Sequence, residues 1–262
     1  MSSVVIKEYY YKCIFHKSIE IKVNQRRNLL DLNGFCFQDL KIIQGFEKLT
    51  ELSRLELNGN HISVIEGLDS LTNLEELFLQ GNNIVEIKGL ENLINLRRLY
   101  LNSNKIKAVE GLESLVNLHE LGLSINLISE IKGLETLKDL ISLNLSNNII
   151  KKIEGFDSLR NLKILNLDGN SDIKIEGLKH LVNLESLSLR RCNISQVEGL
   201  KTLTNLKQLY LDSNNINKIE KLDLLPNLEL LSIADNPIPS YLVQNYEESR
   251  KILVYGSHRK FN

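Results

Sequence analysis

The sequence predicts an α/β fold, a right-handed solenoid with a concave parallel sheet and about nine regular coils. Three series that repeat every 22 residues predict it. Asparagines recur at Asn60, Asn82, Asn104, Asn126, Asn148, Asn170, Asn214 and Asn236. Glycines recur at Gly45, Gly67, Gly89, Gly111, Gly133, Gly155, Gly177 and Gly199. Leucines keep parallel registers, for example at Leu77, Leu99, Leu121, Leu143, Leu165, Leu187, Leu209 and Leu231. Each period is expected to form one coil.

Each position in the repeat has a physical role in the predicted coil. Leu77 and Leu79 alternate with outward-facing residues, which is the period of a short strand. The amide of Asn82 is expected to satisfy buried backbone groups at the turn, which would otherwise cost roughly 1–3 kcal/mol each. Ile84 and Ile87 fill the core on the return path. A single coil cannot close its own core, so the stack is the stable unit.

Three departures from the repeat carry expectations of their own. Asp172 stands where isoleucine is expected, and we expect a local bulge that still buries Ile173. Lys221 replaces the glycine of the last coil. Residues 30–40 form a degenerate first coil, in which Gln38 takes the asparagine step.

Cys192 fills an asparagine step of the ladder. This register predicts an inward, buried and structural thiol, because buried cysteines are usually inert. The alternative is a reactive nucleophile, which rapid thiol labelling would reveal.

The two ends of the chain are expected to cover the terminal cores of the solenoid. Residues 1–28 are β-prone and predict a hairpin that forms a β-rich N-terminal cap; a separate partner-binding module is the alternative. The solenoid of 22-residue coils, with its degenerate first coil, spans residues 29–239.

Residues 240–262 are expected to form a helical C-terminal cap and a tail. Ser240 is a candidate N-cap of the helix, and its apolar face would come from Tyr241, Leu242 and Tyr246. Residues 251–255 are expected to return as a final strand, and residues 258–262 to form a mobile basic tail.

The residues at the repeated positions resemble one known class of repeat protein. Ile65-Glu66-Gly67-Leu68 and Leu71-Thr72-Asn73-Leu74 are similar to the 22-residue leucine-rich repeats typified by the nuclear regulatory subunit of protein phosphatase 1. The outer-arm dynein light chain and a spliceosomal protein share this class. The resemblance runs from about Leu49 to Pro239, and it implies protein binding inside the cell without identifying the partner. Bacterial internalins also have 22-residue repeats, although the isoleucine-glutamate-glycine tripeptide is less typical of them.

The composition of the chain reduces the range of functions and cellular compartments to be considered. The chain carries 32 basic and 33 acidic residues, so the basic excess usual for nucleic-acid binding is absent in total. No apolar run is long enough to predict a membrane span, and the N-terminus does not resemble a cleaved signal. The three cysteines have no metal-ligand or redox spacing, which favours a reducing compartment. We expect a cytoplasmic protein, with the nucleus as the alternative, and a monomer that binds an unidentified protein rather than a membrane.

The sequence contains none of the common catalytic or cofactor-binding motifs that were considered. There is no phosphate loop, no dinucleotide glycine pattern and no His-Glu-x-x-His motif, and the five histidines are far apart. We therefore expect no enzyme, no cofactor and no metal. The predicted function is a non-catalytic interaction scaffold or regulatory subunit. The alternatives are a phosphatase-regulator-like subunit in particular, or a ribonucleoprotein-associated factor.

The concave face of the predicted sheet offers two candidate partner-binding clusters, because residues on either side of each inward leucine face outward. The first, which we call the aromatic cluster, consists of Arg54, Glu56, Glu76, Phe78, Arg98, Tyr100 and Glu120. The second, the arginine–tyrosine cluster, consists of Asp168, Arg190, Tyr210 and Asp212, with Arg191 beside it.

Each candidate surface has a structural alternative. The charges of the aromatic cluster alternate in sign, so they can simply pair with one another, at about 0.2–1 kcal/mol per cross-strand pair. Exposed aromatics ringed by arginine nevertheless fit the composition of interface hot spots. Glutamates before the repeated glycines, such as Glu110 and Glu154, predict a convex acidic stripe. This stripe either binds a basic partner or a cation, or is a solvated face that keeps the solenoid soluble.

Overall fold

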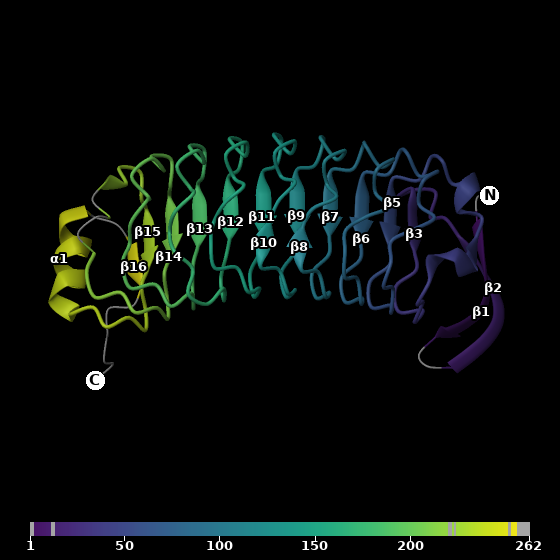
Figure 1. The fold of residues 1–262 in the computed structure, drawn as a ribbon, viewed down its shortest axis with the longest axis horizontal. Coiled ribbons are helices and arrows are strands. Elements are labelled where there is room, and N and C mark those ends of the chain that lie inside the picture. The colour runs from purple at the N-terminus through teal and green to yellow at the C-terminus, as the bar shows by residue number, and fades with distance from the viewer. Residues whose placement is uncertain (1–2, 12–13, 220–221, 223, 251–252, 256–262) are drawn as a thin grey trace. The chain divides into compact units, whose positions relative to one another are not determined.

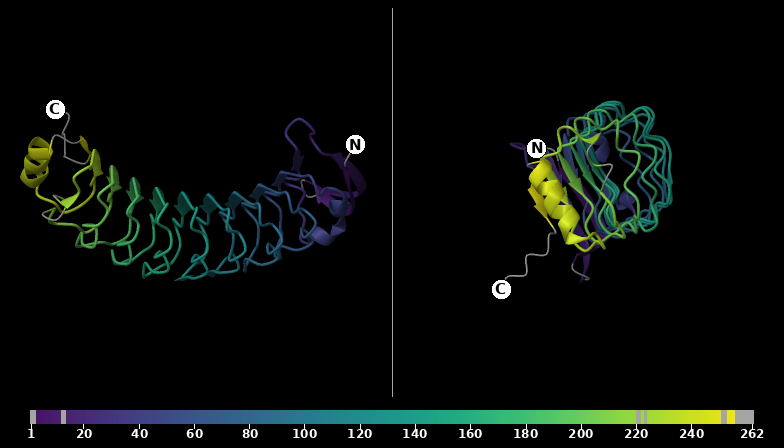
Figure 2. Two further views of the ribbon diagram at one scale, coloured as in Figure 1. Left: turned by 90° about the horizontal axis from the view of Figure 1, so that it is seen from above. Right: turned by 90° about the vertical axis from the view of Figure 1, so that its left-hand side faces the viewer.

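The computed structural model describes residues 3–11, 14–219, 222, 224–250 and 253–255. The chain divides into two compact units, Met1–Leu140 and Ile141–Asn262, and each is built of solenoid coils (Figure 1). In both units the strands lie along one side of the coils and the connecting turns along the other (Figure 2). The predicted Lys221 position and the basic tail lie outside the described residues.

In the first unit, five strands form a parallel sheet in the order β3, β5, β6, β7, β9. They are β3 (Leu29–Asp31), β5 (Arg54–Glu56), β6 (Glu76–Phe78), β7 (Arg98–Tyr100) and β9 (Glu120–Gly122). On the return path of two coils, β8 (Ala108–Val109) and β10 (Glu130–Ile131) form a small parallel pair. Short 3₁₀ turns, η1 (Leu40–Ile42) and η2 (Phe46–Lys48), belong to the first coil.

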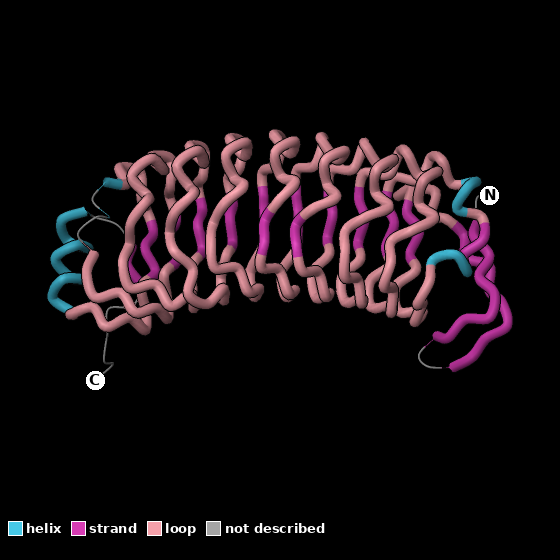
Figure 3. The backbone as a smooth tube through the Cα atoms, viewed as in Figure 1, coloured by secondary structure: helices cyan, strands magenta, loops and turns pink. Residues whose placement is uncertain are grey.

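In the second unit, six strands form a parallel sheet in chain order. They are β11 (Ser142–Asn144), β12 (Ile164–Asn166), β13 (Ser186–Ser188), β14 (Gln208–Tyr210), β15 (Leu230–Ser232) and β16 (Leu253–Tyr255). Turns and loops make up most of each coil outside these strands (Figure 3). The predicted solenoid with a parallel sheet is therefore confirmed.

The core of each coil lies behind the middle residue of its strand. Leu77 in β6 and Leu143 in β11 are fully buried, whereas the residues on either side of them lie toward solvent. Ile84 and Ile87 are buried on the return path, as the repeat predicts. We use the term exposed sheet face for the side of the sheet that bears the first and third residues of the strands.

The repeated asparagines form a buried hydrogen-bond ladder. The side-chain amide of Asn104 donates to the carbonyls of Leu79 and Leu101, at 2.9 and 3.0 Å. Its oxygen accepts the backbone N–H of Ile84, at 2.9 Å. One side chain thus satisfies three buried backbone groups of two adjacent coils, which confirms the predicted role of this position.

The repeated glycines permit a left-handed backbone, and several of them also permit a close approach between coils. Gly111 has φ +75, and a Cβ at this position would lie 2.0 Å from the carbonyl oxygen of Ile87. Any side chain would therefore force the two coils apart.

The first coil does not follow the predicted register. Leu30 in β3 lies opposite Leu55 in β5, so this coil is 25 residues long instead of 22. The position equivalent to Asn60 is therefore Phe35, and Gln38 is exposed to solvent. The prediction that Gln38 takes the asparagine step was wrong.

An aromatic pair replaces the missing ladder amide in this coil. The rings of Phe35 and Phe37 stack with their centroids 5.2 Å apart, and Phe37 is buried. The backbone N–H of Phe37 donates to the side-chain oxygen of Asn60 at 3.1 Å, as Ile62 donates to Asn82 one coil later. The additional residues therefore lie between Phe37 and Gly45, where η1 and β4 (Ile43–Gln44) form.

Ile173 is buried as predicted, and the irregular backbone at Asp172 is linked to the cysteine of the next coil. Asp172 has φ +65, and Ile173 is buried. In a regular coil the N–H at this position donates to a ladder amide, as Ile194 donates to Asn214 at 3.0 Å. Cys192 offers no such oxygen, and the N–H of Asp172 donates to its main-chain carbonyl instead, at 3.1 Å.

Cys192 itself is fully buried, as its register predicts. Its thiol lies 3.3 Å from the carbonyl oxygens of Leu167 and Arg190, to which it donates. Burial raises the pKa of the Cys192 thiol to about 11. The thiolate, which is the nucleophilic form, is therefore scarce at neutral pH.

We expect thiol reagents to modify Cys192 slowly in the folded protein, because its sulfur is buried and protonated. Cys36, which is a half-buried free thiol, provides the internal comparison. The measurement is maleimide labelling over time with peptide mass spectrometry. Cys192→Asn should be tolerated or stabilising, since an amide at this step can donate to the same Leu167 carbonyl. Labelling of Cys192 as fast as that of Cys36 would contradict its buried role.

The N-terminal residues form the predicted hairpin. Strands β1 (Ser3–Tyr11) and β2 (Ile14–Lys22) pair antiparallel, and β1 also pairs with β4 of the first coil. Val4 and Ile6 are buried, and Ile6 lies opposite Ile43. This arrangement fits a cap, which remains our interpretation of residues 1–28.

The C-terminal residues form a helix and a final strand. Helix α1 spans Ser240–Arg250, and β16 pairs with β15. The side chains of Val243 and Tyr246 are buried on one side of α1, whereas Tyr241 is exposed. The prediction that Tyr241 belongs to the apolar face was wrong, because a residue two positions before Val243 lies on the opposite side of a helix.

Candidate functional site

The structure brings all seven residues of the aromatic cluster together on the exposed sheet face of the first unit. They occupy the first and third positions of β5, β6, β7 and β9. The strand register places Arg54 beside Glu76, Glu76 beside Arg98, and Arg98 beside Glu120. It also places Phe78 between Glu56 and Tyr100.

The charged residues of this cluster form a continuous network. Arg54 donates to Glu76 at 2.7 Å and to Glu56 at 2.7 and 2.9 Å. Arg98 donates to Glu120 at 3.1 Å and also to the second oxygen of Glu76. Glu76 thus bridges the two guanidinium groups, and the alternating pairing suggested by the sequence is present.

The two aromatic rings form a stack that this network supports. The centroids of Phe78 and Tyr100 are 5.1 Å apart, with an interplanar angle of 18°. The guanidinium of Arg54 lies over the Phe78 ring, 4.4 Å from its centroid. The Tyr100 hydroxyl donates to Glu120. Desolvation by burial, together with this hydrogen bond, raises the pKa of Tyr100 to about 12.

Gly122 provides the space that the stack occupies. It lies directly beside Tyr100 on the adjacent strand, β9. A Cβ on Gly122 would lie 2.7 Å from Cδ1 of Tyr100 and 2.9 Å from the side-chain amide of Asn102. The Tyr100 ring has room in this position because residue 122 carries no side chain.

The geometry bears on both interpretations of the aromatic cluster. The pairing accounts for its charges without a ligand, and exposed pairs of this kind contribute only about 0.2–1 kcal/mol each. The same pairing holds two aromatic rings in fixed positions on an accessible surface. Rigid aromatic groups lose little conformational entropy on binding, which favours their use as interface anchors.

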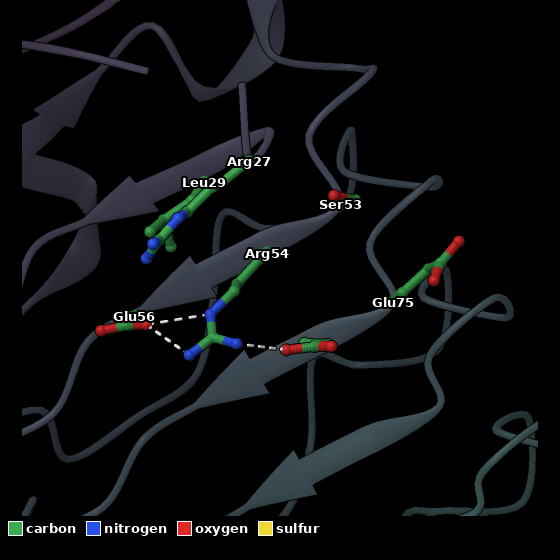
Figure 4. Close-up of a pocket in the computed structure, with 7 residues that line it drawn as sticks. Arg27, Leu29, Ser53, Arg54, Glu56 and Glu75 are labelled. Carbon is green, nitrogen blue, oxygen red and sulfur yellow. Dashed lines mark hydrogen bonds and ion pairs between the residues drawn. The ribbon is translucent and has the colours of Figure 1, made fainter. Parts of the chain in front are cut away.

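A hollow adjoins the aromatic cluster at the N-terminal end of the sheet (Figure 4). Its volume is about 420 Å³. It is lined by Arg27, Leu29, Ser53, Arg54, Glu56, Glu75 and Glu76. Arg54, Glu56 and Glu76 thus belong both to the aromatic cluster and to this hollow.

The arginine–tyrosine cluster also assembles, on the exposed sheet face of the second unit. Arg190 donates to Asp212 at 2.7 Å and lies over the Tyr210 ring, 4.3 Å from its centroid. Asp168 and Asp212 also accept backbone N–H groups of the following coil, from Arg190 at 2.7 Å and Ala234 at 3.0 Å. One oxygen of each carboxylate is therefore committed to the fold, which leaves Tyr210 and Arg190 as the better candidates for binding.

The second unit also exposes apolar side chains that the sequence reasoning left out of its candidate site. Ile164, Leu253 and Tyr255 are 48%, 50% and 53% exposed. Leu253 and Tyr255 follow Leu230 and Ser232 in register on β16. The alternation of the predicted final strand was the available signal, since burial of Val254 requires both of its neighbours to face outward.

Among the described residues, no group of three or more His, Cys, Asp or Glu side chains is placed to hold a metal ion. His180 lies 3.2 Å from Asp157, and His119 contacts the carbonyl of Asn117, so these two histidines interact locally. Of the helices in the described part of the chain, none has the length and apolar character of a membrane span.

The repeat geometry agrees with a comparison against protein families. The model described as "Leucine Rich repeats (2 copies)" matches residues 50–93, 94–136, 138–180 and 182–227. The chain belongs to the leucine-rich-repeat family. This family model describes the repeat in general, so the finer class suggested by the sequence remains a proposal. Among curated proteins, no match to this leucine-rich-repeat chain was found.

Similar solved structures include three from Listeria monocytogenes. An internalin C2 has 28% identity and a TM-score of 0.67, covering 75% of this chain and 87% of its own. The internalin inlF has 27% identity and a TM-score of 0.54, covering 89% and 82%. The functional domain of InlJ, which includes a cysteine ladder, has 22% identity and a TM-score of 0.67, covering 82% of this chain. The chain spans 46% of that InlJ chain, and at this identity the likeness shows the fold alone.

Proposed function

We propose that this leucine-rich-repeat protein is a non-catalytic interaction scaffold or regulatory subunit that binds another protein on its exposed sheet face. A cytoplasmic location, with the nucleus as the alternative, is part of this proposal. The repeated leucines are committed to the core. The outward rows of the strands are therefore the part of the sheet that can specify a partner.

The observation that carries the proposal is the stacked pair of Phe78 and Tyr100 on this face. Arg54 and Glu120 hold the two rings by direct contact, and Gly122 leaves room for them. A surface whose aromatic groups are already ordered loses less entropy on association than a mobile one. Aromatic and arginine side chains are also the residues that most often dominate interface energetics.

The proposal is tested by capture of proteins from native lysate. The full chain is immobilised, and bound proteins are identified by mass spectrometry and then purified. We expect at least one protein that is retained by the wild type and lost with Phe78→Ala combined with Tyr100→Ala. Partners that are retained equally by both proteins would place binding elsewhere and contradict the proposal.

A further inference from the structure

We propose that the N-terminal part of the exposed sheet face, on β3, β5 and β6, binds a basic segment of the partner protein. A lysine or arginine side chain of that segment would enter the hollow beside Arg54. This inference rests on the proposed function, because it names the chemistry of the partner that the same face would take.

The charges of this face are unequal. The outward residues of β3, β5, β6, β7 and β9 carry four carboxylates and two guanidinium groups. These residues are Asp31, Glu56, Glu76, Glu120, Arg54 and Arg98. The whole chain is nearly neutral, with a formal net charge of −1, so the acidic surplus is a local property of this surface. A local field of this sign attracts basic partners and repels acidic ones, including phosphates.

The surplus is concentrated where two carboxylates face each other. Asp31 and Glu56 are direct partners in the register of β3 and β5. Like charges in directly opposite positions of a sheet are destabilising. Glu56 is paired with Arg54, whereas Asp31 is exposed and has no ion pair within the described part of the chain. A cation from the partner at this pair would remove a repulsion that the free protein contains.

The adjoining hollow suits the shape of a long basic side chain. Leu29 offers an apolar surface for the methylene stem, in the way that lysine and arginine stems commonly pack. Glu56, Glu75 and Glu76 supply carboxylates for the charged end, against the cations of Arg27 and Arg54. The carboxylate of Glu75 lies 4.0 Å from Nε of Arg97 and is half exposed, so it is accessible to a second donor.

Random peptides displayed on phage serve as the probe, because the natural partner is not identified. The full chain is the immobilised target, and each enriched sequence is synthesised together with a version in which lysine and arginine are replaced by glutamine. We expect enrichment of peptides that contain lysine or arginine, and binding that weakens by about tenfold or more in the glutamine versions. Binding should also weaken at about 1 M salt, where the screening length falls to about 3 Å.

The test variant is Asp31→Asn combined with Glu56→Gln. Asp31→Asn keeps the oxygen that accepts from the Asn33 N–H, and Glu56→Gln keeps the oxygen that accepts from Arg54. Glu56→Gln gives up only the bond from the Asn33 side chain, at 2.8 Å, so the fold should be retained. The thermal midpoint should stay close to that of the wild type, because the repulsion that is removed offsets the charge that Arg54 loses from its pair with Glu56. The matched control is Glu110→Gln combined with Glu135→Gln, which removes two exposed charges away from the sheet strands.

We expect the Asp31→Asn, Glu56→Gln protein to bind the basic peptides at least about tenfold more weakly, and the control to bind them like the wild type. Enrichment of acidic or purely apolar peptides, or of none, would overturn the inference. So would equal binding by the test variant and the wild type. The Phe78→Ala, Tyr100→Ala protein separates the two claims. If it alone loses peptide binding, the exposed sheet face stands and only the basic partner is wrong; if neither variant loses binding, both fail.

Discussion

Replacement of Leu143 by aspartate is expected to unfold the coil that contains it together with its neighbours in the second unit. Leu143 is fully buried in the middle of β11, opposite Leu165 of β12. Loss of a buried leucine alone costs about 2–5 kcal/mol, and burial of an unpaired carboxylate adds to this. The net stability of a domain is only about 5–15 kcal/mol. Adjacent coils share their core, so the damage should spread beyond one coil.

The measurement is thermal unfolding followed by circular dichroism. Ile164→Asp provides the matched control, because Ile164 is an aliphatic residue of the adjacent strand that is 48% exposed on the outer side. The control should unfold close to the wild-type temperature. An unchanged midpoint for Leu143→Asp would refute the assignment of inward and outward positions in the repeat.

Replacement of both Phe78 and Tyr100 by alanine is expected to weaken partner binding by about 2 kcal/mol or more, as truncation of hot-spot residues does. Folding should remain nearly intact, because these rings stack on the exposed sheet face and the leucines behind them form the core. The affinity is measured by titration against the partner captured from lysate, with thermal unfolding as the check of stability.

The control for this pair lies on the return side of the coils. Glu110→Ala combined with Glu154→Ala changes two exposed residues of the acidic stripe and should alter binding little. Loss of binding in the control with no loss in the aromatic variant would reassign the aromatic cluster to sheet stability. It would also move the partner to the stripe.

The regular coils were predictable from the sequence because each repeated position has one dominant physical demand. A leucine at the middle of a strand must be buried, and an amide at the end of the strand must satisfy backbone groups, as Leu77 and Asn104 do. The first coil was not predictable to the same degree. Phe35 stands at its asparagine position and stacks on Phe37, so the pattern contains no asparagine from which to count.

The candidate site was predictable as a set of neighbours but not as an arrangement. The strand period and the 22-residue spacing place Arg54, Phe78 and Tyr100 on the same side of three adjacent strands. They do not predict which carboxylate each arginine binds, or that the absence of a side chain at Gly122 makes room for the Tyr100 ring. These features depend on rotamers and on the close approach of strands, which a residue pattern does not encode.

The central claim, that a partner binds the exposed sheet face, is tested most directly by site-specific photo-crosslinking. A benzophenone-bearing phenylalanine analogue is placed at position 80, two residues after Phe78 on the same side of the sheet, or at position 107 on the return path, in the full chain. After irradiation with the captured partner, we expect a covalent complex from position 80 and little from position 107. A complex that forms from position 107 and not from position 80 would contradict the claim.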